Sequence, residues 1–289
     1  MRVLLIGASG YVGSAVAEHL SSLGDDIVAL ERPGADTGAS EYETRTGDLA
    51  DPASLTAAVT PDIDAVVNLA TPSGDTAVDA AAVVALTDPL RGTGKPFVYT
   101  SGIWVLGATD GADETSPTNP IPIVGYRPEI ERQVLALADA GVRAAVIRPG
   151  IVHGRGGGIP ALLVDLARKH EAPVIVADDS VVWPMVHIDD LADLFAKVVH
   201  AAPSGSIWHG IGQPAVPVAD LATAAAQAAG VTGDTEIWPL DEARAELGTP
   251  FADALALSQT ITGQAAIERL GWKPEGPDVI SDLTDGSYH

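Results

Sequence analysis

The sequence predicts a doubly wound α/β fold, in which helices cover both faces of a parallel β-sheet and a smaller lobe follows. Short apolar runs alternate with helical stretches over residues 1–150, which is typical of βαβ units. A glycine-rich turn joins the first predicted strand to the first predicted helix. After Pro149 the alternation becomes irregular. We therefore expect a first domain over 1–150 and a substrate-binding lobe over 151–289, with segments near 186–200 returning to the first domain.

The predicted strands are short apolar runs, and the predicted helices carry apolar residues three or four positions apart. The first domain has predicted strands at Val3–Ile6, Ile27–Leu30, Ala65–Ala70, Phe97–Thr100 and Ala144–Ile147. Its predicted helices are Tyr11–Leu23, which Gly24 ends, Pro52–Val59, Ala77–Leu90 and Pro128–Ala140. The lobe has predicted helices at Ile159–His170, Ile188–His200, Val218–Ala229 and Asp278–Asp285, and predicted strands at Val174–Val176 and Ser206–His209.

Composition excludes several classes of protein. The 289 residues include 16 Lys and Arg against 39 Asp and Glu, which gives a net charge of −23. Nucleic-acid-binding proteins need a basic surface, so we expect no nucleic-acid partner. For the same reason we do not expect the protein to bind anionic lipid. The chain has no cysteine, which excludes disulfides and thiolate metal sites. It also lacks an apolar run of about 18 residues. We expect a soluble cytoplasmic protein with a small-molecule substrate and no membrane partner.

The turn after the first strand has the spacing Gly7-x-x-Gly10-x-x-Gly13. In this pattern Gly7 allows a tight turn, Gly10 lets the backbone approach a pyrophosphate, and Gly13 lets the helix pack on the strand. The free N–H groups and the dipole at the helix N-terminus favour an anion. A strand precedes the motif and a helix follows it, as dinucleotide binding requires. The sequence therefore predicts a Rossmann domain that binds a dinucleotide.

The second strand leads to Glu31, eighteen residues after Gly13. An acid at this position accepts hydrogen bonds from the adenosine ribose, which favours NAD. Arg32 follows and is suited to the 2′-phosphate of NADP, which is the alternative. Asp48 is interpreted either as a ligand of the adenine amine or as a helix cap. Leu69, Ala70 and Thr71 follow the third strand, at the carboxyl edge of the sheet where ligands bind.

Several segments together resemble an extended, atypical short-chain dehydrogenase/reductase of the NAD-dependent epimerase/dehydratase family. They are Gly7–Gly13, Gly47–Leu49, Asn68–Ala70, Phe97–Gly102, Glu131–Arg132, Arg148–Gly154, Val186–Ala192 and Leu270–Pro274. They cover nearly the whole chain in the family's order. The resemblance implies a Rossmann domain with a C-terminal substrate lobe. It also places further residues along the cofactor, namely Ser9, Tyr11, Val12, Leu49, Thr100, Arg127 and Pro149.

This chain lacks part of the catalytic pattern of that family. Family members use a Ser or Thr, a Tyr that transfers the proton, and a Lys four residues after the Tyr. No Tyr-x-x-x-Lys is present. When Glu131 and Arg148-Pro149 are used as landmarks, Ile123 falls at the Tyr position and Arg127 at the Lys position. Ser101 lies one residue before the usual Ser or Thr.

Four residues remain as catalytic candidates, each with a structural alternative. Ser101 is suited to polarise a carbonyl, or is a strand-end hydroxyl. Tyr126 is a proton donor, or a helix-entry aromatic. Arg127 is expected to anchor the nicotinamide ribose and lower the pKa of a neighbouring phenol, or pairs with Glu131 at the surface. His153 is an acid near neutral pH, or a loop imidazole bonded to backbone.

Three further expectations concern other ligands and partners. Arg155, in the Gly154–Gly158 loop, is expected to hold an anionic substrate group or to lie in a mobile loop. The histidines show no metal-like spacing, so we predict no metal. The helix Pro128–Ala140 carries Ile130, Val134, Leu135, Leu137 and Ala138, some of which are expected to pack in a homodimer.

The sequence therefore predicts an NAD(P)-dependent oxidoreductase, or an epimerase/dehydratase-like enzyme, with a non-standard set of catalytic residues. The expected substrate is a small carbonyl or hydroxyl compound, or a sugar. Two alternatives follow from the missing Tyr-x-x-x-Lys. One is a redox sensor that binds the dinucleotide without catalysis, and the other is an isomerase or lyase with a vestigial cofactor.

Overall fold

The centre of the molecule is a seven-stranded sheet in which every neighbouring pair is parallel. The computed structural model describes residues 1–34 and 41–289. The sheet order is β11-β7-β5-β4-β1-β2-β3. These strands are β1 (Arg2–Ile6), β2 (Asp26–Glu31), β3 (Glu43–Thr46), β4 (Ala65–Asn68), β5 (Pro96–Thr100), β7 (Arg143–Pro149) and β11 (Ser206–Gly210). The order reverses between β1 and β4, and this places a crevice at the carboxyl ends of the strands.

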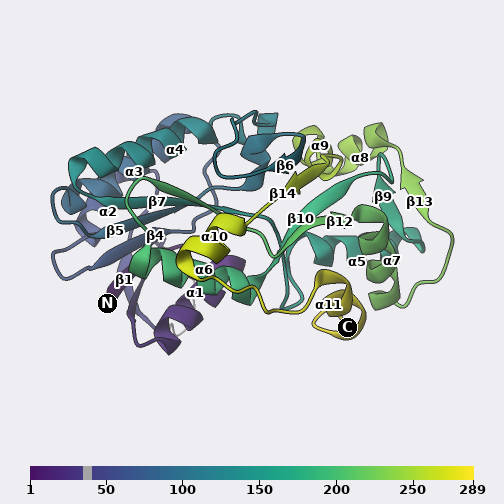
Figure 1. Cartoon of the computed structure of the whole chain (residues 1–289), viewed down its shortest axis with the longest axis horizontal. Coiled ribbons are helices and arrows are strands. Elements are labelled where there is room, and N and C mark those ends of the chain that lie inside the picture. Colours follow the sequence, from purple (N-terminus) through teal and green to yellow (C-terminus); the bar gives the residue numbers. More distant parts are fainter. Residues whose placement is uncertain (35–40) are drawn as a thin grey trace.

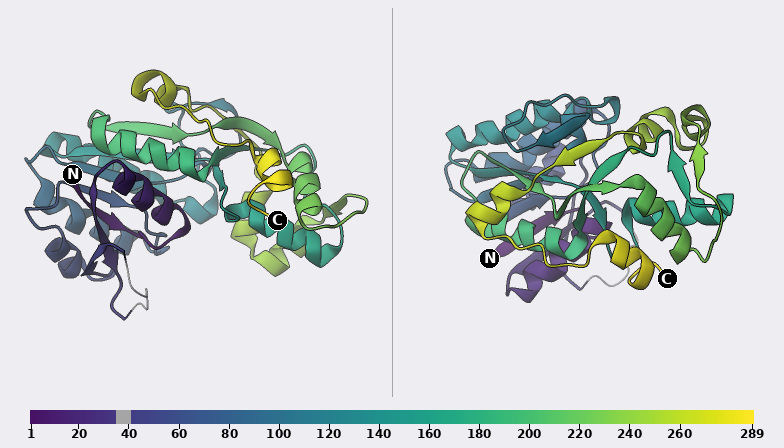
Figure 2. Two further views of the ribbon diagram at one scale, coloured as in Figure 1. Left: turned by 90° about the horizontal axis from the view of Figure 1, so that it is seen from below. Right: turned by 45° about the vertical axis from the view of Figure 1, so that its right-hand side comes forward.

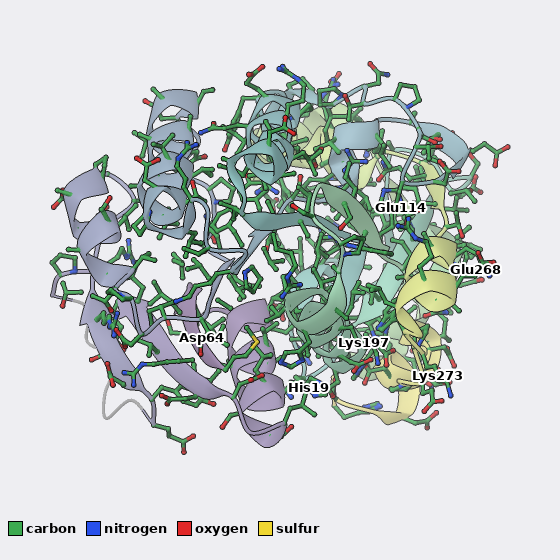
Figure 3. All side chains as sticks on the ribbon, turned by 60° about the vertical axis from the view of Figure 1, so that its left-hand side comes forward. His19, Asp64, Glu114, Lys197, Glu268 and Lys273 are labelled. Carbon is green, nitrogen blue, oxygen red and sulfur yellow. The ribbon has the colours of Figure 1, made fainter. Side chains whose placement is uncertain are left out.

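Helices cover both faces of this sheet, which confirms the doubly wound fold (Figure 1). One face carries α1 (Tyr11–Ser22) and α6 (Ile188–Ala201), which pack on each other. The other face carries α2 (Pro52–Ala58), α3 (Thr76–Thr87) and α4 (Arg127–Ala136). On the first face, Asp193 of α6 lies 3.5 Å from His19 of α1 and 3.7 Å from Lys197, both labelled in Figure 3.

The predicted elements of the sheet are confirmed, with small shifts at their ends. The strand predicted as Ala65–Ala70 ends at Asn68, because the Asn68 side chain accepts the Ala70 N–H and turns the chain. The helices predicted to end at Leu90 and Ala140 finish in 3-10 turns, Asp88–Leu90 and Leu137–Ala140. The strand β3 is not among the predicted elements, because its four residues are polar and lie at the sheet edge.

The C-terminal lobe lies at one end of the sheet, beyond the carboxyl ends of its strands (Figures 1 and 2). Its helices are α5 (Gly158–His170), α7 (Val218–Ala228), α8 (Leu240–Leu247), α9 (Thr249–Leu255) and α11 (Val279–Asp285). Its strands are β6 (Thr109–Ala112), β8 (Ile151–His153), β9 (Val174–Val176), β10 (Val182–His187), β12 (Gln213–Pro217), β13 (Glu236–Trp238) and β14 (Gln259–Ile261). Besides α6, the strand β11 and the helix α10 (Gln264–Leu270) return to the central sheet.

None of the helices in the described ranges combines the length and the apolar character that crossing a membrane requires. The helix α4 offers little apolar surface for the predicted dimer. Its Ile130 and Val134 are fully buried, and Leu137 is also buried, so these three side chains belong to the core. The homodimer stays a prediction.

A buried polar network ties α4 to the far edge of the sheet. The Arg148 guanidinium on β7 donates to both carboxylate oxygens of Glu131 on α4, at 3.0 and 2.6 Å. Its Nη1 lies 3.4 Å from Nε2 of His209 on β11, whose Nδ1 lies 3.2 Å from the Thr262 carbonyl oxygen. These contacts make His209 a neutral imidazole that donates through Nδ1 and accepts through Nε2. Burial, and secondly the Arg148 charge, lower the pKa of His209 to about 4.

This pKa predicts a stability that depends on pH. Between the ordinary value of 6.5 and the folded value of about 4, the unfolded chain binds a proton that native His209 does not. The free energy of unfolding is therefore expected to fall as pH is lowered through this window, by up to about 1.4 kcal/mol per pH unit. His209→Gln keeps a donor and an acceptor but does not titrate. Its urea unfolding is expected to show a shallower pH slope than the parent, whereas the surface variant His200→Gln serves as control. Equal slopes for His209→Gln and the parent would contradict the assignment.

Candidate functional site

A cavity of about 590 Å³ follows the carboxyl edge of the sheet from β2 to β4. Most of the predicted cofactor residues line it, namely Gly7, Ser9, Gly10, Glu31, Arg32, Asp48, Leu49, Leu69, Ala70 and Thr71. They come from four separate loops, each of which follows a strand of the sheet. The topology therefore brings together residues that the sequence analysis assigned to one ligand.

The glycine turn at one end of this cavity depends on close backbone contacts. Gly7 has φ +87°, and a Cβ there would lie 2.9 Å from the Ala70 nitrogen. A Cβ on Gly13 would lie 1.9 Å from the Gly7 carbonyl oxygen, so Gly13 lets α1 press against the turn. Gly10 has an ordinary φ of −75° and caps α1 without a side-chain hydrogen bond. The first N–H groups of α1 are therefore open to an anion at this end.

Of the charged residues that line the cavity, Glu31 and Arg32 are without partners in the part of the chain that the structure describes, whereas Asp48 accepts a backbone hydrogen bond. Within the described ranges, neither the Glu31 carboxylate nor the Arg32 guanidinium has a hydrogen-bond or ion-pair partner, so both are open to a ligand. Asp48 is not the helix cap, and that interpretation is wrong. Asp51 caps α2 by accepting the N–H groups of Ala53 and Ser54. Asp48 Oδ1 instead accepts the Ala50 N–H at the cavity wall.

A second cavity of about 570 Å³ adjoins the first, and both are lined by Thr71, Pro72 and Ser73. The remaining predicted cofactor residues other than Gly13 line this second cavity, namely Tyr11, Val12, Thr100, Arg127 and Pro149. Three of the four catalytic candidates also line it, namely Ser101, Tyr126 and Arg127. Ile123, which the register places at the family's Tyr position, forms part of the same wall. The two cavities therefore meet at Thr71–Ser73, and between them they are lined by all of the predicted cofactor residues except Gly13.

Thr100, Ser101 and Arg127 line the second cavity, and their polar side-chain atoms have no partner among the described residues. Thr100 and Ser101 follow each other at the end of β5, and their buried hydroxyl oxygens have no hydrogen-bond partner. Ser101 is only 5% exposed. Arg127 lies at the start of α4, with a guanidinium nitrogen 3.7 Å from the position of a Cβ on Gly102. The predicted pairing of Arg127 with Glu131 is wrong, because Arg148 occupies that carboxylate.

Tyr126 lines the cavity, but its hydroxyl is already engaged. It donates to Asp79 Oδ2 at 2.8 Å, and Asp79 Oδ1 accepts the backbone and side-chain donors of Ser73. Burial, together with the hydrogen bond and the charge of Asp79, raises the pKa of Tyr126. The Arg127 charge acts in the opposite direction and is outweighed. Arg127 therefore acts on the pKa of Tyr126 in the expected direction, but the net pKa of this phenol is raised.

His153 lies outside the linings of both cavities. It is 1% exposed, and its Nδ1 lies 3.1 Å from Asp282 Oδ2, so its partner is a carboxylate rather than backbone. Burial lowers the pKa of His153, against the opposing hydrogen bond from Asp282. His187 packs edge-on at 5.1 Å, and possible ligand atoms of the three side chains lie within 4.8 Å of one another. The spacing of the sequence does not reveal this cluster, and the absence of a metal stays a prediction.

Sequence reasoning also missed contacts that shape the second cavity. Asp79 is a buried carboxylate on an otherwise apolar helix face, and that placement was the available signal. At the C-terminus, the Tyr288 hydroxyl accepts the Gly154 N–H and donates to the Gly157 carbonyl. The Tyr11 hydroxyl donates to the Gly154 carbonyl. These contacts hold the Gly154–Gly158 loop from segments more than 100 residues away, for which a single sequence gives no local signal.

Comparison with known proteins identifies the family of the chain. The model of the NAD-dependent epimerase/dehydratase family matches residues 3–209, and so confirms the resemblance seen in the sequence. An uncharacterized protein of Saccharomyces cerevisiae is 28% identical over 306 aligned residues, which cover 98% of each chain. A dTDP-4-dehydrorhamnose reductase of Burkholderia thailandensis is 30% identical over 229 residues, covering 73% of this chain and 71% of the reductase.

A solved structure also has the same fold. The UDP-glucose 4-epimerase of Thermus thermophilus, determined in complex with NAD, superposes with a TM-score of 0.79. The match covers 100% of this chain and 99% of the epimerase, at 19% identity. At this level of identity the likeness concerns the fold alone.

The glycine turn generates a prediction about ligand affinity. Gly10→Val keeps an allowed backbone conformation, since φ is −75° and the nearest atom to its Cβ is the Gly7 oxygen at 3.2 Å. Its side chain would occupy the open end of the first cavity. Calorimetry with NADH is expected to show an affinity roughly 100-fold weaker, or about 2.8 kcal/mol. Gly13→Val, which meets the Gly7 oxygen at 1.9 Å, is expected to lower the melting temperature instead. An unchanged affinity in a folded Gly10→Val variant would exclude a dinucleotide at this turn.

Proposed function

Because the chain belongs to the NAD-dependent epimerase/dehydratase family, we propose that it is an oxidoreductase that uses NAD to interconvert a small carbonyl compound and its alcohol. The observation that carries the proposal is the group of unpartnered polar atoms in the second cavity. Thr100, Ser101 and Arg127 line this cavity, which adjoins the first at Thr71–Ser73, and the Thr100 and Ser101 hydroxyls are buried without a hydrogen-bond partner within the described ranges. Binding sites are commonly apolar cavities with a few convergent polar groups.

The residues of the first cavity fit a dinucleotide. The uncapped first turn of α1 is suited to the pyrophosphate, with Gly10 leaving room for it. The Glu31 carboxylate is suited to the adenosine ribose, and Asp48 and Leu49 to the adenine. The nicotinamide end then reaches Thr71–Ser73, where the two cavities adjoin. When bound, NAD(H) supplies or accepts the hydride.

Within the second cavity, Ser101 and Arg127 take different roles. The buried Ser101 hydroxyl donates to the substrate oxygen and so polarises the carbonyl. Arg127 holds the ribose hydroxyls and stabilises negative charge on that oxygen. A guanidinium group does not give up its proton at usable pH, so Arg127 cannot serve as the acid. His153 does not belong to the described lining of the cavity and contacts Asp282, so we give it no part in the reaction.

The proton route that fits these contacts runs through Tyr126 to Asp79. The phenol donates its proton to Asp79 and keeps a lone pair for the cavity. In the oxidation direction, the alcohol proton passes to the Tyr126 oxygen as the phenol proton passes to Asp79. In the reduction direction, protonated Asp79 returns a proton along the same pair. A water molecule held by Ser101 is the alternative donor, and the variants below separate the two.

A second candidate function is a redox sensor that binds the dinucleotide without catalysis. Two observations favour it: Ile123 occupies the wall where the family's Tyr is expected, and the Tyr126 hydroxyl is held by Asp79. An isomerase or lyase with a vestigial cofactor is the third. Turnover of NADH with a panel of ketones and nucleotide sugars tests the enzyme directly. The absence of turnover by a protein that binds NADH tightly would favour the sensor.

The choice between NAD and NADP is expected to depend on Glu31. Its carboxylate would repel a 2′-phosphate, so NADH is expected to bind at least about tenfold more tightly than NADPH. Glu31→Ser removes this repulsion and leaves Arg32 beside the phosphate, so the preference is expected to narrow or reverse. Nicotinamide fluorescence gives the dissociation constants of NADH and NADPH for the parent and for Glu31→Ser. A parent protein that prefers NADPH would instead make Arg32 the phosphate ligand.

The roles of Tyr126 and Arg127 are expected to separate kinetically. Tyr126→Phe removes only the proton route and should slow turnover roughly 10²–10⁴-fold without changing NADH affinity. Arg127→Ala removes a cofactor contact and a positive charge, so affinity and turnover should fall together. Stopped-flow measurement of NADH oxidation, with calorimetry for affinity, tests both variants. If the Tyr126→Phe variant turned over within about threefold of the parent rate, the proton donor would instead be the water held by Ser101.

A further inference from the structure

We propose that the substrate of this site is a neutral and largely apolar carbonyl compound, or its alcohol, rather than a nucleotide sugar. This inference rests on the proposed oxidoreductase function and adds the chemical class of the substrate. It follows from which side chains form the second cavity, where its polar atoms lie, and how the nearby charges are used.

Beyond the cofactor end, the wall of the second cavity is apolar. It consists mainly of Trp104, Ile123, Val124, Ile151, Val152 and Ile159. These residues come from the 3-10 turns at Ile103–Leu106 and Pro122–Val124, from β8, and from the start of α5. Trp104 is held edge-on against Phe251 of α9, with ring centroids 6.4 Å apart. A wall of this kind stabilises a hydrocarbon or aromatic group by removing its surface from water.

The described lining of the second cavity lacks the groups that recognise a nucleotide sugar. It contains no Asp, Glu, Asn, Gln, His or Lys side chain. Among its hydroxyl groups, those of Tyr11, Ser73 and Tyr126 already donate within the protein, which leaves few donors for sugar hydroxyls. Its cationic side chain is Arg127, at the cofactor end. A diphosphate needs cations or free N–H groups in a protein whose net charge is −23. Burial of unpaired polar groups in an apolar cavity is strongly unfavourable.

Apart from Arg127 and the first turn of α1, which the proposed cofactor would occupy, two nearby groups able to bind an anion are already covered. Arg155, expected from the sequence to hold an anionic substrate group, pairs instead with Glu18 and Asp189, each at 2.7 Å. It does not belong to the described lining of the cavity. The first turn of α5 reaches the cavity, but the Tyr11 ring lies against it. A Cβ on Gly157 would meet that ring at 2.4 Å.

The second cavity combines a few unpartnered polar groups with an apolar wall. Thr100, Ser101 and Arg127 line it together with Trp104 and Ile123, and the Thr100 and Ser101 hydroxyls have no partner among the described residues. A substrate with one carbonyl and an apolar body fits this combination. In the reduction, the carbonyl carbon would receive a hydride supplied by bound NADH, and the oxygen would receive a proton by the route through Tyr126. The products are the alcohol and NAD⁺.

The test compares an apolar ketone with a nucleotide sugar. We expect the protein to oxidise NADH with acetophenone, and to reduce NAD⁺ with 1-phenylethanol but not with UDP-glucose. Ile123→Ser replaces a cavity side chain that is 37% exposed, and should raise KM for acetophenone about tenfold. Ile237→Ser is the matched control, because Ile237 is 46% exposed on β13 and outside the cavity lining. Its KM should equal that of the parent.

The outcomes separate the substrate class from the function. Turnover or saturable binding of UDP-glucose, without acetophenone turnover, would overturn the substrate class and leave the oxidoreductase intact. Saturable binding of acetophenone to the NADH-loaded protein without turnover would support the class and overturn the function. Equal KM values for Ile123→Ser and Ile237→Ser would also overturn the class, as would a failure of acetophenone either to bind or to react.

Discussion

The ion pair between Glu131 and Arg148 joins the helix that carries the site to the sheet beneath it. Both side chains are almost fully buried, and the guanidinium donates to both carboxylate oxygens. Removal of either partner would leave an uncompensated buried charge, which costs about 3–5 kcal/mol in proteins. The pair therefore fixes α4 against β7. Arg127 lies one helical turn before Glu131, so the ion pair also fixes the point from which Arg127 reaches the second cavity. Because Glu131 pairs with Arg148, its carboxylate does not bind the Arg127 guanidinium.

The sheet was predictable because its central strands are buried on both faces and so appear as short runs of β-branched residues. The strand β3 was not predictable, because Glu43–Thr46 lies at the sheet edge and its polar side chains give no apolar run. In the lobe, the sequence predicted the helices α5, α7 and α11 and the strand β9, but most of the strands were not predicted, for another reason. Its strands are three to six residues long and find partners far along the chain, as β14 does with β6, where Gln259 faces Thr109. Such pairings depend on the tertiary fold and leave no periodic pattern in the sequence.

The same distinction holds within the site. The first cavity follows from local turns after successive strands, so its glycines, Glu31 and Asp48 were all identified from spacing. The second cavity depends on contacts between distant segments. The hydrogen bond from Tyr126 to Asp79 spans 47 residues, and that from His153 to Asp282 spans 129. Consequently, the sequence identified Tyr126 and His153 as candidates but did not reveal that one lines the cavity with an engaged hydroxyl and the other lies outside its described lining.

In the proposed function, Arg127 stands at the position of the family's lysine, and this changes how charge and proton transfer are divided. A lysine can both hold the ribose and lower the pKa of an adjacent tyrosine, whereas Ile123 provides no phenol at that position. Arg127 keeps the positive charge but does not exchange protons. The proton must then travel through a separate group, and Tyr126 with its partner Asp79 lies on the same wall. Because the wall is mainly apolar, a substrate that fills it excludes water and lowers the local dielectric constant. The Arg127 charge then acts more strongly on the substrate oxygen, so the apolar wall contributes to catalysis as well as to selection.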